Sequence, residues 1–276
     1  MPWVRKMIER YDKDAKESGA LIIPSCGFDC VPSDLTAFLC MQKLQAPASA
    51  RVFLKMKGGV SGGTIASVVA MMDSQPGAPD QNALVLDAPA PEHPDGAPLR
   101  TSTFDGENYY GAFAIMASVN AAVVQRTVAL LGAPRLEWRE YMRVKGVFSG
   151  LLMSFASYLV VAVLATPLRH LVARMIPPGT GPSEETQRNG RFEIVAHATS
   201  EEQKEVLVTM KGRCDPGYSG TAKMITETAV AVAQGAAHGK TGFQTTGSAL
   251  GLELVKRLES TGYFTFETRE PGHRER

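Results

Sequence analysis

The sequence has few of the features that would link it to nucleic acid, metal ions or an oxidising compartment. Its formal net charge is only +1 and no basic tract is interleaved with aromatic residues, so composition excludes a strongly basic nucleic-acid-binding protein. Among its four cysteines, Cys26 and Cys30 do not have C-x-x-C spacing, and no nearby histidine completes a tetrahedral site. We therefore expect free thiols in a reducing compartment, no metal and no nucleic-acid partner.

The residues of this sequence contain no dinucleotide fingerprint and no histidine-based catalytic arrangement, and we expect no secretory leader. The N-terminal region has no G-x-G-x-x-G turn, its first residues open no apolar run, and the five histidines are scattered. The nearest glycine-rich turn, residues 58–64, has the outer frame of a P-loop, but Thr64 stands in place of the lysine. Its N–H groups suit an anion. In the alternative interpretation its glycines only permit tight packing.

The apolar patterns that are present predict an α/β (α+β) fold. Residues 2–18 have helical spacing, residues 20–24 form a wholly apolar run, and residues 32–44 are again helical. A short, wholly apolar run is typical of a strand buried on both faces of a parallel sheet. We interpret residues 1–46 as the remnant of a Rossmann-type parallel sheet whose opening strands are not in this polypeptide.

The other elements follow from periodicity and turn residues, and they predict a mixed sheet. Strands are expected over 51–57, 109–119, 136–145, 192–198 and 204–211, and helices over 64–72, 120–132, 218–235 and 248–260. A long loop or lid is expected over 74–108, and a solvated charged tail over 267–276. We predict a mixed α+β substrate and oligomerisation domain over 47–247, followed by a C-terminal helix and tail over 248–276.

One segment is unusually apolar. No charged residue lies between Gly146 and Leu168, and 15 of the 20 residues in 147–166 are apolar. This length is sufficient to cross the hydrocarbon core of a bilayer, although three serines weaken that interpretation. The flanks are basic on both sides and give no orientation. Two interpretations stay open: a helix in contact with lipid, or a helix buried between layers of a soluble protein.

Two motifs suggest a ligand site. Cys26-Gly27-Phe28-Asp29 follows the predicted strand, and ligands of open α/β sheets lie beyond the carboxyl ends of strands. Asp29 and Asp34 are therefore candidates for ligand hydrogen bonds or acid–base chemistry, with helix capping as the alternative.

The second motif is the turn that begins at Asp215 and runs into a helix. Tyr218 and Lys223 are candidates for holding a substrate there, because free N–H groups at a helix N-terminus favour an anion. We expect Ser219 or Thr221 to cap this helix. In the alternative interpretation the turn only begins an ordinary capped helix, in which Lys223 pairs with Glu227 four residues on.

Together these motifs resemble the saccharopine-dehydrogenase-like oxidoreductases, a family that also includes trans-acting enoyl reductases of lipid biosynthesis. Cys26 to Asp34 is similar to the family's C-G-F-D-S-[IV]-P-S-D signature, with Cys30 replacing the usual serine. The segments that begin at Ser61, Gly181 and Tyr218 resemble its later S-G-G-T, G-P-S-E-E and Y-x-x-T-A-x-M motifs, in family order. The likeness covers nearly the whole chain.

The resemblance implies a two-domain enzyme in which a Rossmann domain binds NAD(P) and a mixed domain closes over a small-molecule or lipid-like substrate. We expect Cys26, Gly27, Phe28 and Asp29 to lie near the cofactor edge. We expect Ser61, Gly62, Gly63 and Thr64, or Tyr218, to lie near the substrate. In the family, the glycine-rich dinucleotide turn precedes the position that is Met1 here, so we expect a truncated cofactor half.

The resemblance also implies a link to lipid metabolism. We expect a cytoplasmic-side protein, associated with a membrane or lipid droplet through residues 147–166, and a homo-oligomer. A second hypothesis is a non-catalytic membrane- or lipid-droplet-associated protein that retains the fold. A third is an incomplete gene model.

Overall fold

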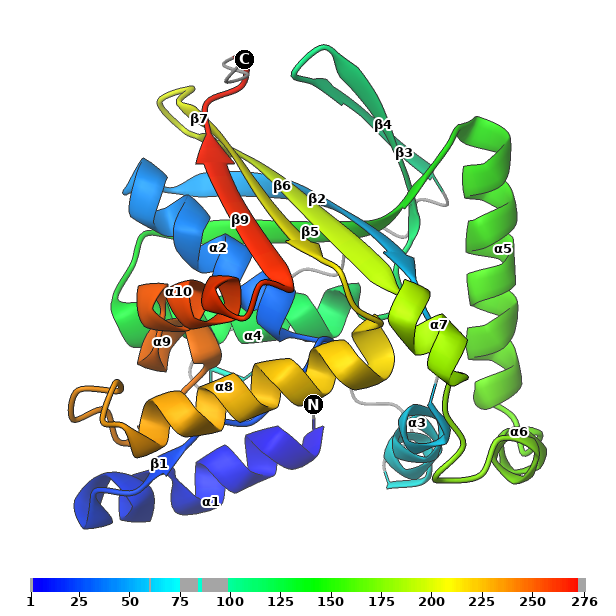
Figure 1. The fold of residues 1–276 in the computed structure, drawn as a ribbon, viewed down its shortest axis with the longest axis horizontal. Helices are drawn as coiled ribbons and strands as arrows, with labels where there is room; N and C mark the ends of the chain where they lie inside the picture. The colour runs from blue at the N-terminus through cyan, green and yellow to red at the C-terminus, as the bar shows by residue number, and fades with distance from the viewer. Residues whose placement is uncertain (1, 60, 75–83, 86–98, 273–276) are drawn as a thin grey trace.

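A computed structural model describes residues 2–59, 61–74, 84–85 and 99–272, and its centre is a mixed sheet (Figure 1). The strand order is β3-β4-β5-β2-β6-β7-β9. The strands are β2 (Ala48–Lys57), β3 (Leu99–Phe104), β4 (Glu107–Phe113), β5 (Leu136–Val144), β6 (Arg191–Ser200), β7 (Glu205–Gly212) and β9 (Phe264–Arg269). Only β2 and β5 pair in parallel within this sheet. A separate parallel pair joins β1 (Leu21–Ile22) to β8 (Gly242–Phe243).

Helices cover one face of the mixed sheet and form the main core with it (Figure 1). The helices are α1 (Pro2–Ser18), α2 (Val31–Leu44), α3 (Gly62–Ser74), α4 (Ala117–Leu131), α5 (Val147–Leu164), α6 (Arg169–Met175), α7 (Glu184–Asn189), α8 (Thr221–Ala233), α9 (Thr246–Ala249) and α10 (Leu252–Ser260), with a π turn η2 (Pro216–Gly220) before α8. The central helix α2 is buried on most of its surface, since Val31, Leu35 and Cys40 have no exposed area. Strand alternation supplies the other half of the core, for example through Val52 and Ile194.

The β3–β4 hairpin reaches from one edge of the sheet to the other. Its Phe104 ring stacks on His197 of β6, with ring centroids 4.6 Å apart. At the tip of the hairpin, the Asp105 carboxylate forms an ion pair with Arg269 of β9 and accepts a hydrogen bond from the Gly272 N–H at 2.9 Å. The hairpin therefore covers an aromatic cluster on the second face of the sheet, formed by Phe53, Phe104, Tyr109, Tyr141, Val195 and Leu207.

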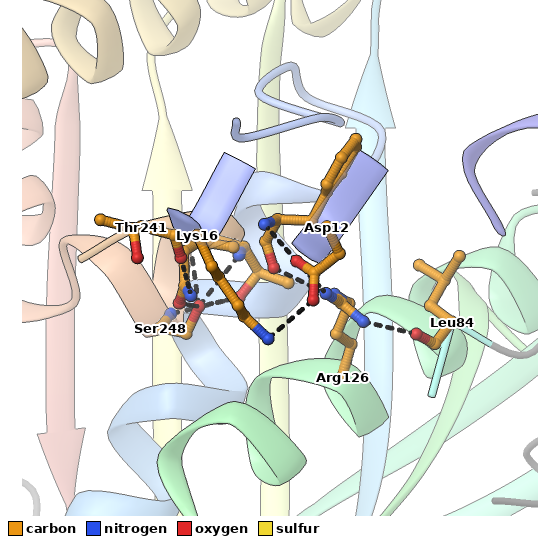
Figure 2. Close-up of polar contacts among 9 residues, drawn as sticks. Asp12, Lys16, Leu84, Arg126, Thr241 and Ser248 are labelled. Atoms are coloured by element: carbon orange, nitrogen blue, oxygen red, sulfur yellow. Dashed lines mark hydrogen bonds and ion pairs between the residues drawn. The ribbon is translucent and has the colours of Figure 1, made fainter. Parts of the chain in front are cut away.

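The small parallel pair is joined to α4 by an arginine that donates hydrogen bonds to two backbone carbonyls (Figure 2). The Arg126 guanidinium of α4 donates to the carbonyls of Leu84 and Phe243, each at 2.6 Å. Asp12 of α1 accepts from the Phe243 N–H at 2.7 Å and pairs with Lys16 on the same helix. These contacts tie α1, β8 and α4 together.

The predicted combination of a parallel sheet, a mixed sheet and one long apolar helix is present, but several boundaries were wrong. The strand expected over 20–24 is only the two residues of β1, and it is half-buried because it has one strand neighbour. The strand expected over 109–119 ends at Phe113, and α4 already begins at Ala117 after a turn closed by the Ala117 N–H and the Ala114 carbonyl.

Three of the described strands, and the short helices α6 and α7, were absent from the prediction. β3 lies inside the segment predicted as a loop or lid, and residues 75–83 and 86–98 of that segment lie outside the described residues. β8 was missed because two residues carry no periodicity, and β9 includes part of the segment predicted as a solvated tail. The three predicted domains stay a prediction; helices α2 and α10, from the first and third of them, contribute to one hydrophobic core with the sheet.

Candidate functional site

A buried aspartate joins three segments that are far apart in the sequence. Asp215, which has no exposed area, accepts hydrogen bonds from the Gly59 N–H at 3.2 Å and the Tyr218 N–H at 2.7 Å. Its own N–H donates to the Gln187 carbonyl at 3.3 Å. Asp215 therefore fixes the turn after β2, the end of α7 and the start of the π turn relative to one another.

The Thr180 carbonyl and the Thr221 hydroxyl connect this Asp215 junction to the predicted site motifs. The Thr180 carbonyl accepts from the Gly62 N–H at 2.8 Å and from the Tyr218 hydroxyl at 3.3 Å. The Thr221 hydroxyl accepts from the Phe28 N–H at 3.1 Å. The signature loop, the glycine-rich turn and the Tyr218 turn, which the sequence separates widely, thus meet in one place.

The four predicted cofactor-edge residues lie on the loop between β1 and α2. The Cys26 thiol is partly buried and donates to the Ile23 carbonyl at 3.0 Å; burial, and then the nearby Asp34 carboxylate, raise its pKa to about 11. Gly27 lies against the Thr221 methyl group, and the Phe28 ring packs edge-on against Phe192. The Asp29 side chain is exposed. A thiol with a raised pKa stays protonated at neutral pH, so Cys26 is a poor nucleophile.

The start of α3 is formed by the last four residues of the glycine-rich turn, Ser61 to Thr64. The Ser61 hydroxyl accepts from the Thr64 N–H at 3.0 Å, which caps this helix. Gly62 is buried against Pro177, whereas Gly63 and Thr64 are exposed. The tight-packing interpretation therefore holds for Gly62, while Gly63 and Thr64 are open to a ligand.

Three backbone N–H groups of the signature loop, residues 26–34, already form hydrogen bonds within the protein. The N–H groups of Cys30 and Val31 both donate to the Gly27 carbonyl, and the Phe28 N–H is used by Thr221. A pyrophosphate site needs free N–H groups at a helix N-terminus. These three N–H groups are therefore not free to bind a phosphate.

An open pocket of about 340 Å³ lies beside the Tyr218 turn. Its lining residues are Glu184, Gln187, Arg188, Arg213, Cys214, Ser219, Lys223 and Tyr263. Three of these side chains are cationic and one is acidic, so the pocket favours a ligand with an anionic group. Within the described part of the chain, no group of histidine, cysteine, aspartate and glutamate side chains is arranged to bind a metal ion.

Two predictions about the Tyr218 turn were wrong. Neither Ser219 nor Thr221 caps the following helix; Asp215 caps the π turn instead, a role that its position before Pro216 could have indicated. Lys223 does not pair with Glu227. Its ammonium group lies over the Tyr263 ring, 4.2 Å from the centroid, and Glu227 pairs with Arg257.

Asp34 is removed from the list of candidates because it has no exposed area. Its carboxylate accepts from the Thr246 hydroxyl at 2.7 Å and from the Gly247 N–H at 2.6 Å, and also from the Thr127 hydroxyl. It holds α9 and α4 against α2. This is neither ligand binding nor the helix cap that formed the alternative, since it joins segments more than 90 positions apart.

The chain has distant homologues named for an enzyme activity. It is 28% identical over 301 residues to a Mycobacterium tuberculosis protein whose name assigns it provisionally to the trans-acting enoyl reductases, covering 97% of this chain and 72% of that protein. It is 27% identical to a Mycobacterium bovis protein and 25% identical to a Mycobacterium ulcerans protein, both named trans-acting enoyl reductase; each alignment covers 96% of this chain and 71% of the relative. No known family profile matches the sequence.

Proposed function

We propose that the chain forms the substrate side of an enoyl-reductase-type oxidoreductase, related to the saccharopine-dehydrogenase-like enzymes that its motifs resemble. The names of its distant homologues fit this activity. The observation that carries the proposal is the junction itself: Thr180 and Thr221 bring the signature loop, the glycine-rich turn and Tyr218 together.

Reduction of an enoyl group sets a clear requirement for the protein. A hydride adds to the carbon β to a carbonyl, the carbonyl oxygen gains negative charge, and a proton then reaches the α carbon. NAD(P)H supplies the hydride in this proposal. The protein must place a hydrogen-bond donor at the carbonyl oxygen as charge develops there.

Tyr218 is the best-placed donor for that oxygen. Its side chain is half-buried, and its hydroxyl has only a long 3.3 Å contact to the Thr180 carbonyl, which a substrate oxygen could replace. Gly63 and Thr64 lie exposed on the neighbouring turn. The adjacent cationic pocket, with Arg213 and Lys223, would hold an anionic part of the substrate or its carrier.

The cofactor edge belongs to the opposite side of the same junction. In this proposal, Cys26, Gly27, Phe28 and Asp29 face the NAD(P) that supplies the hydride. The αβα order of α1, β1 and α2, with the parallel neighbour β8, supports a Rossmann-like origin for this part of the fold.

The test is turnover of reduced nicotinamide with an enoyl thioester such as crotonyl-CoA. Tyr218→Phe keeps the ring that packs against Gly181 and removes only the hydroxyl. We expect kcat to fall about 100-fold, the effect of losing one donor to a developing oxyanion, with an unchanged Tm.

Tyr11→Phe, which alters an exposed tyrosine on α1, is the matched control and should leave kcat unchanged. Wild-type turnover with an unchanged rate in Tyr218→Phe would remove Tyr218 from the mechanism. No turnover with either NADH or NADPH, together with crotonyl-CoA binding that Tyr218→Phe leaves unchanged, would contradict the proposal and favour the non-catalytic alternative.

A further inference from the structure

Helix α5 turns its small and polar side toward the protein and its large apolar side outward. Gly150 and Ser154 are buried against the β3–β4 hairpin, and a Cβ at Gly150 would lie 2.4 Å from a Leu99 methyl carbon. The Ser154 hydroxyl accepts from the Phe113 N–H at 2.9 Å. Phe148 and Phe155 are 81% and 67% exposed. A helix that packs on a soluble core has the opposite arrangement. Small residues at the packing surface and large apolar residues outside are typical of helices in lipid.

The exposed apolar surface surrounds most of the helix. At about 100° per residue, the exposed large side chains cover an arc of about 240°. They are Val147, Phe148, Leu151, Leu152, Met153, Phe155, Tyr158, Leu159 and Val160. A partner helix or a flat protein surface covers a stripe of roughly 100°. A fluid phase covers every side that the protein leaves open, so this arc favours lipid over a second copy of the chain.

The surface continues beyond the end of α5 and is bordered by positive charge. Leu168, Leu171 and Met175 of the following segment and α6 are all exposed. Lys145 before α5 and Arg174 within α6 are exposed cations. Apolar side chains flanked by lysine and arginine suit the boundary between acyl chains and anionic headgroups.

The sheet topology argues against a helix α5 that crosses a membrane. β5 precedes α5 and β6 follows it, and both strands pair with the same strand, β2. A crossing helix would put β5 and β6 on opposite sides of the bilayer unless a second span of about 20 apolar residues returned the chain. The return segment, residues 165–190, contains charged residues and only the short helices α6 and α7.

We propose that α5 and α6 form a monotopic membrane-docking surface that inserts its outward apolar side into one leaflet of an anionic bilayer. This surface is separate from the Tyr218 junction and does not depend on an enzyme activity. It would give the protein access to molecules dissolved in, or attached to, a lipid surface.

The experiment measures flotation of the full chain with sealed vesicles of phosphatidylcholine, with and without phosphatidylglycerol. We expect the wild type to float with both, and more strongly with the anionic lipid. The double variant Phe148→Gln/Phe155→Gln should lower the vesicle partition coefficient at least tenfold, because both side chains are exposed and contribute apolar area to lipid. Trp3→Gln removes an equally exposed ring on α1 and should change binding less than twofold.

Two results of the flotation experiment would overturn the proposal. In the first, the wild type does not bind vesicles and sediments as an oligomer, and the double variant Phe148→Gln/Phe155→Gln is a monomer. This result would identify the surface as a protein interface. The second is an equal loss of vesicle binding in Trp3→Gln.

Orientation is tested with Lys145→Cys and Arg174→Cys on vesicle-bound protein, using a membrane-impermeant maleimide and the wild type as the thiol background. Both new thiols should react from the outside. Protection of only one of them would show that α5 spans the bilayer.

Discussion

Among the described residues, three carboxylates are buried, those of Asp34, Glu140 and Asp215, and each accepts hydrogen bonds from several donors. Glu140 of β5 accepts from the Ser33 hydroxyl at 2.7 Å, from the Asn120 amide at 3.0 Å and from the Trp138 N–H at 3.3 Å. Burial raises the pKa of Glu140, and these donors oppose that shift. The buried Asn120 amide oxygen has no hydrogen-bond partner among the described atoms. The oxygen of an Asn120 amide turned by 180° would accept a hydrogen bond from the O–H group of a neutral Glu140.

The first prediction concerns this residue and pH. A carboxyl whose folded-state pKa is raised favours the folded state most below its unfolded pKa, near 4.5. That contribution is lost as pH rises from there through the folded-state pKa. Glu140→Gln does not titrate, so the free energy of unfolding of the wild type relative to this variant should fall as pH increases across that window. Urea unfolding at a series of pH values measures it. A difference that is constant with pH, or that grows as pH rises, would contradict the raised pKa.

At the scale of elements, the beginning of α3 depends on the close approach of two backbone segments. A Cβ at Gly62 would lie 1.9 Å from the Pro177 carbonyl oxygen, which nothing in the backbone can easily relieve. At Gly63 the nearest atom, the Ser61 hydroxyl oxygen, would lie 3.6 Å away. Close packing therefore requires a glycine at position 62 but leaves room for a larger side chain at position 63.

The second prediction uses that contrast. Gly62→Ala should destabilise the protein by roughly 1–3 kcal/mol through overpacking. It should also displace the Thr180 carbonyl from Tyr218 and so lower turnover. Gly63→Ala is the control and should be neutral or stabilising by up to about 1 kcal/mol, because alanine is the better helix former. Thermal unfolding of the two variants compares them directly, and equal losses would contradict the packing argument.

At the scale of the whole molecule, contacts between distant segments hold the hairpin and the small parallel pair in place. The hairpin tip at Asp105 meets Arg269 on the opposite edge strand, and the carboxylate of Asp105 is nearly buried. Arg126 of α4 donates to two carbonyls from separate segments, those of Leu84 and Phe243 (Figure 2). The Asp105–Arg269 contact fixes the tip of the hairpin that covers the aromatic cluster.

The third prediction tests the contact between Asp105 and Arg269 at the tip of the hairpin. Asp105→Asn keeps a side chain that tolerates the positive φ of 56° at this turn, and it removes the charge that Arg269 meets. We expect a loss of about 1–2 kcal/mol, the range for a hydrogen bond to a charged group, measured by urea unfolding. Glu202→Gln, which breaks a fully exposed pair with Lys204, should leave stability unchanged. A similar loss of stability in both variants would show that the Asp105–Arg269 contact stabilises the protein no more than an exposed ion pair does.

Hydrophobic periodicity by itself determined most long elements, because it depends only on local spacing. Helix α2 and strands β5 to β7 begin and end within a few residues of their predicted positions. The two-residue strands β1 and β8 have no period to detect, and β3 was hidden in a segment rich in proline, although the Asp105-Gly106 turn is a hairpin signal. The sequence also identified the motifs at residues 26–29, 61–64 and 218, but could not show that they meet.

Tertiary structure alone decided the rest, for a physical reason that is the same in each case. Hydrogen bonds at Thr180, Thr221 and Asp215 join segments far apart in the chain, so no local pattern predicts them. The same holds for α5. Its composition permitted a buried, a spanning or a lipid-surface helix, and only its packing shows that most of its apolar side chains face outward while both of its ends return to one sheet.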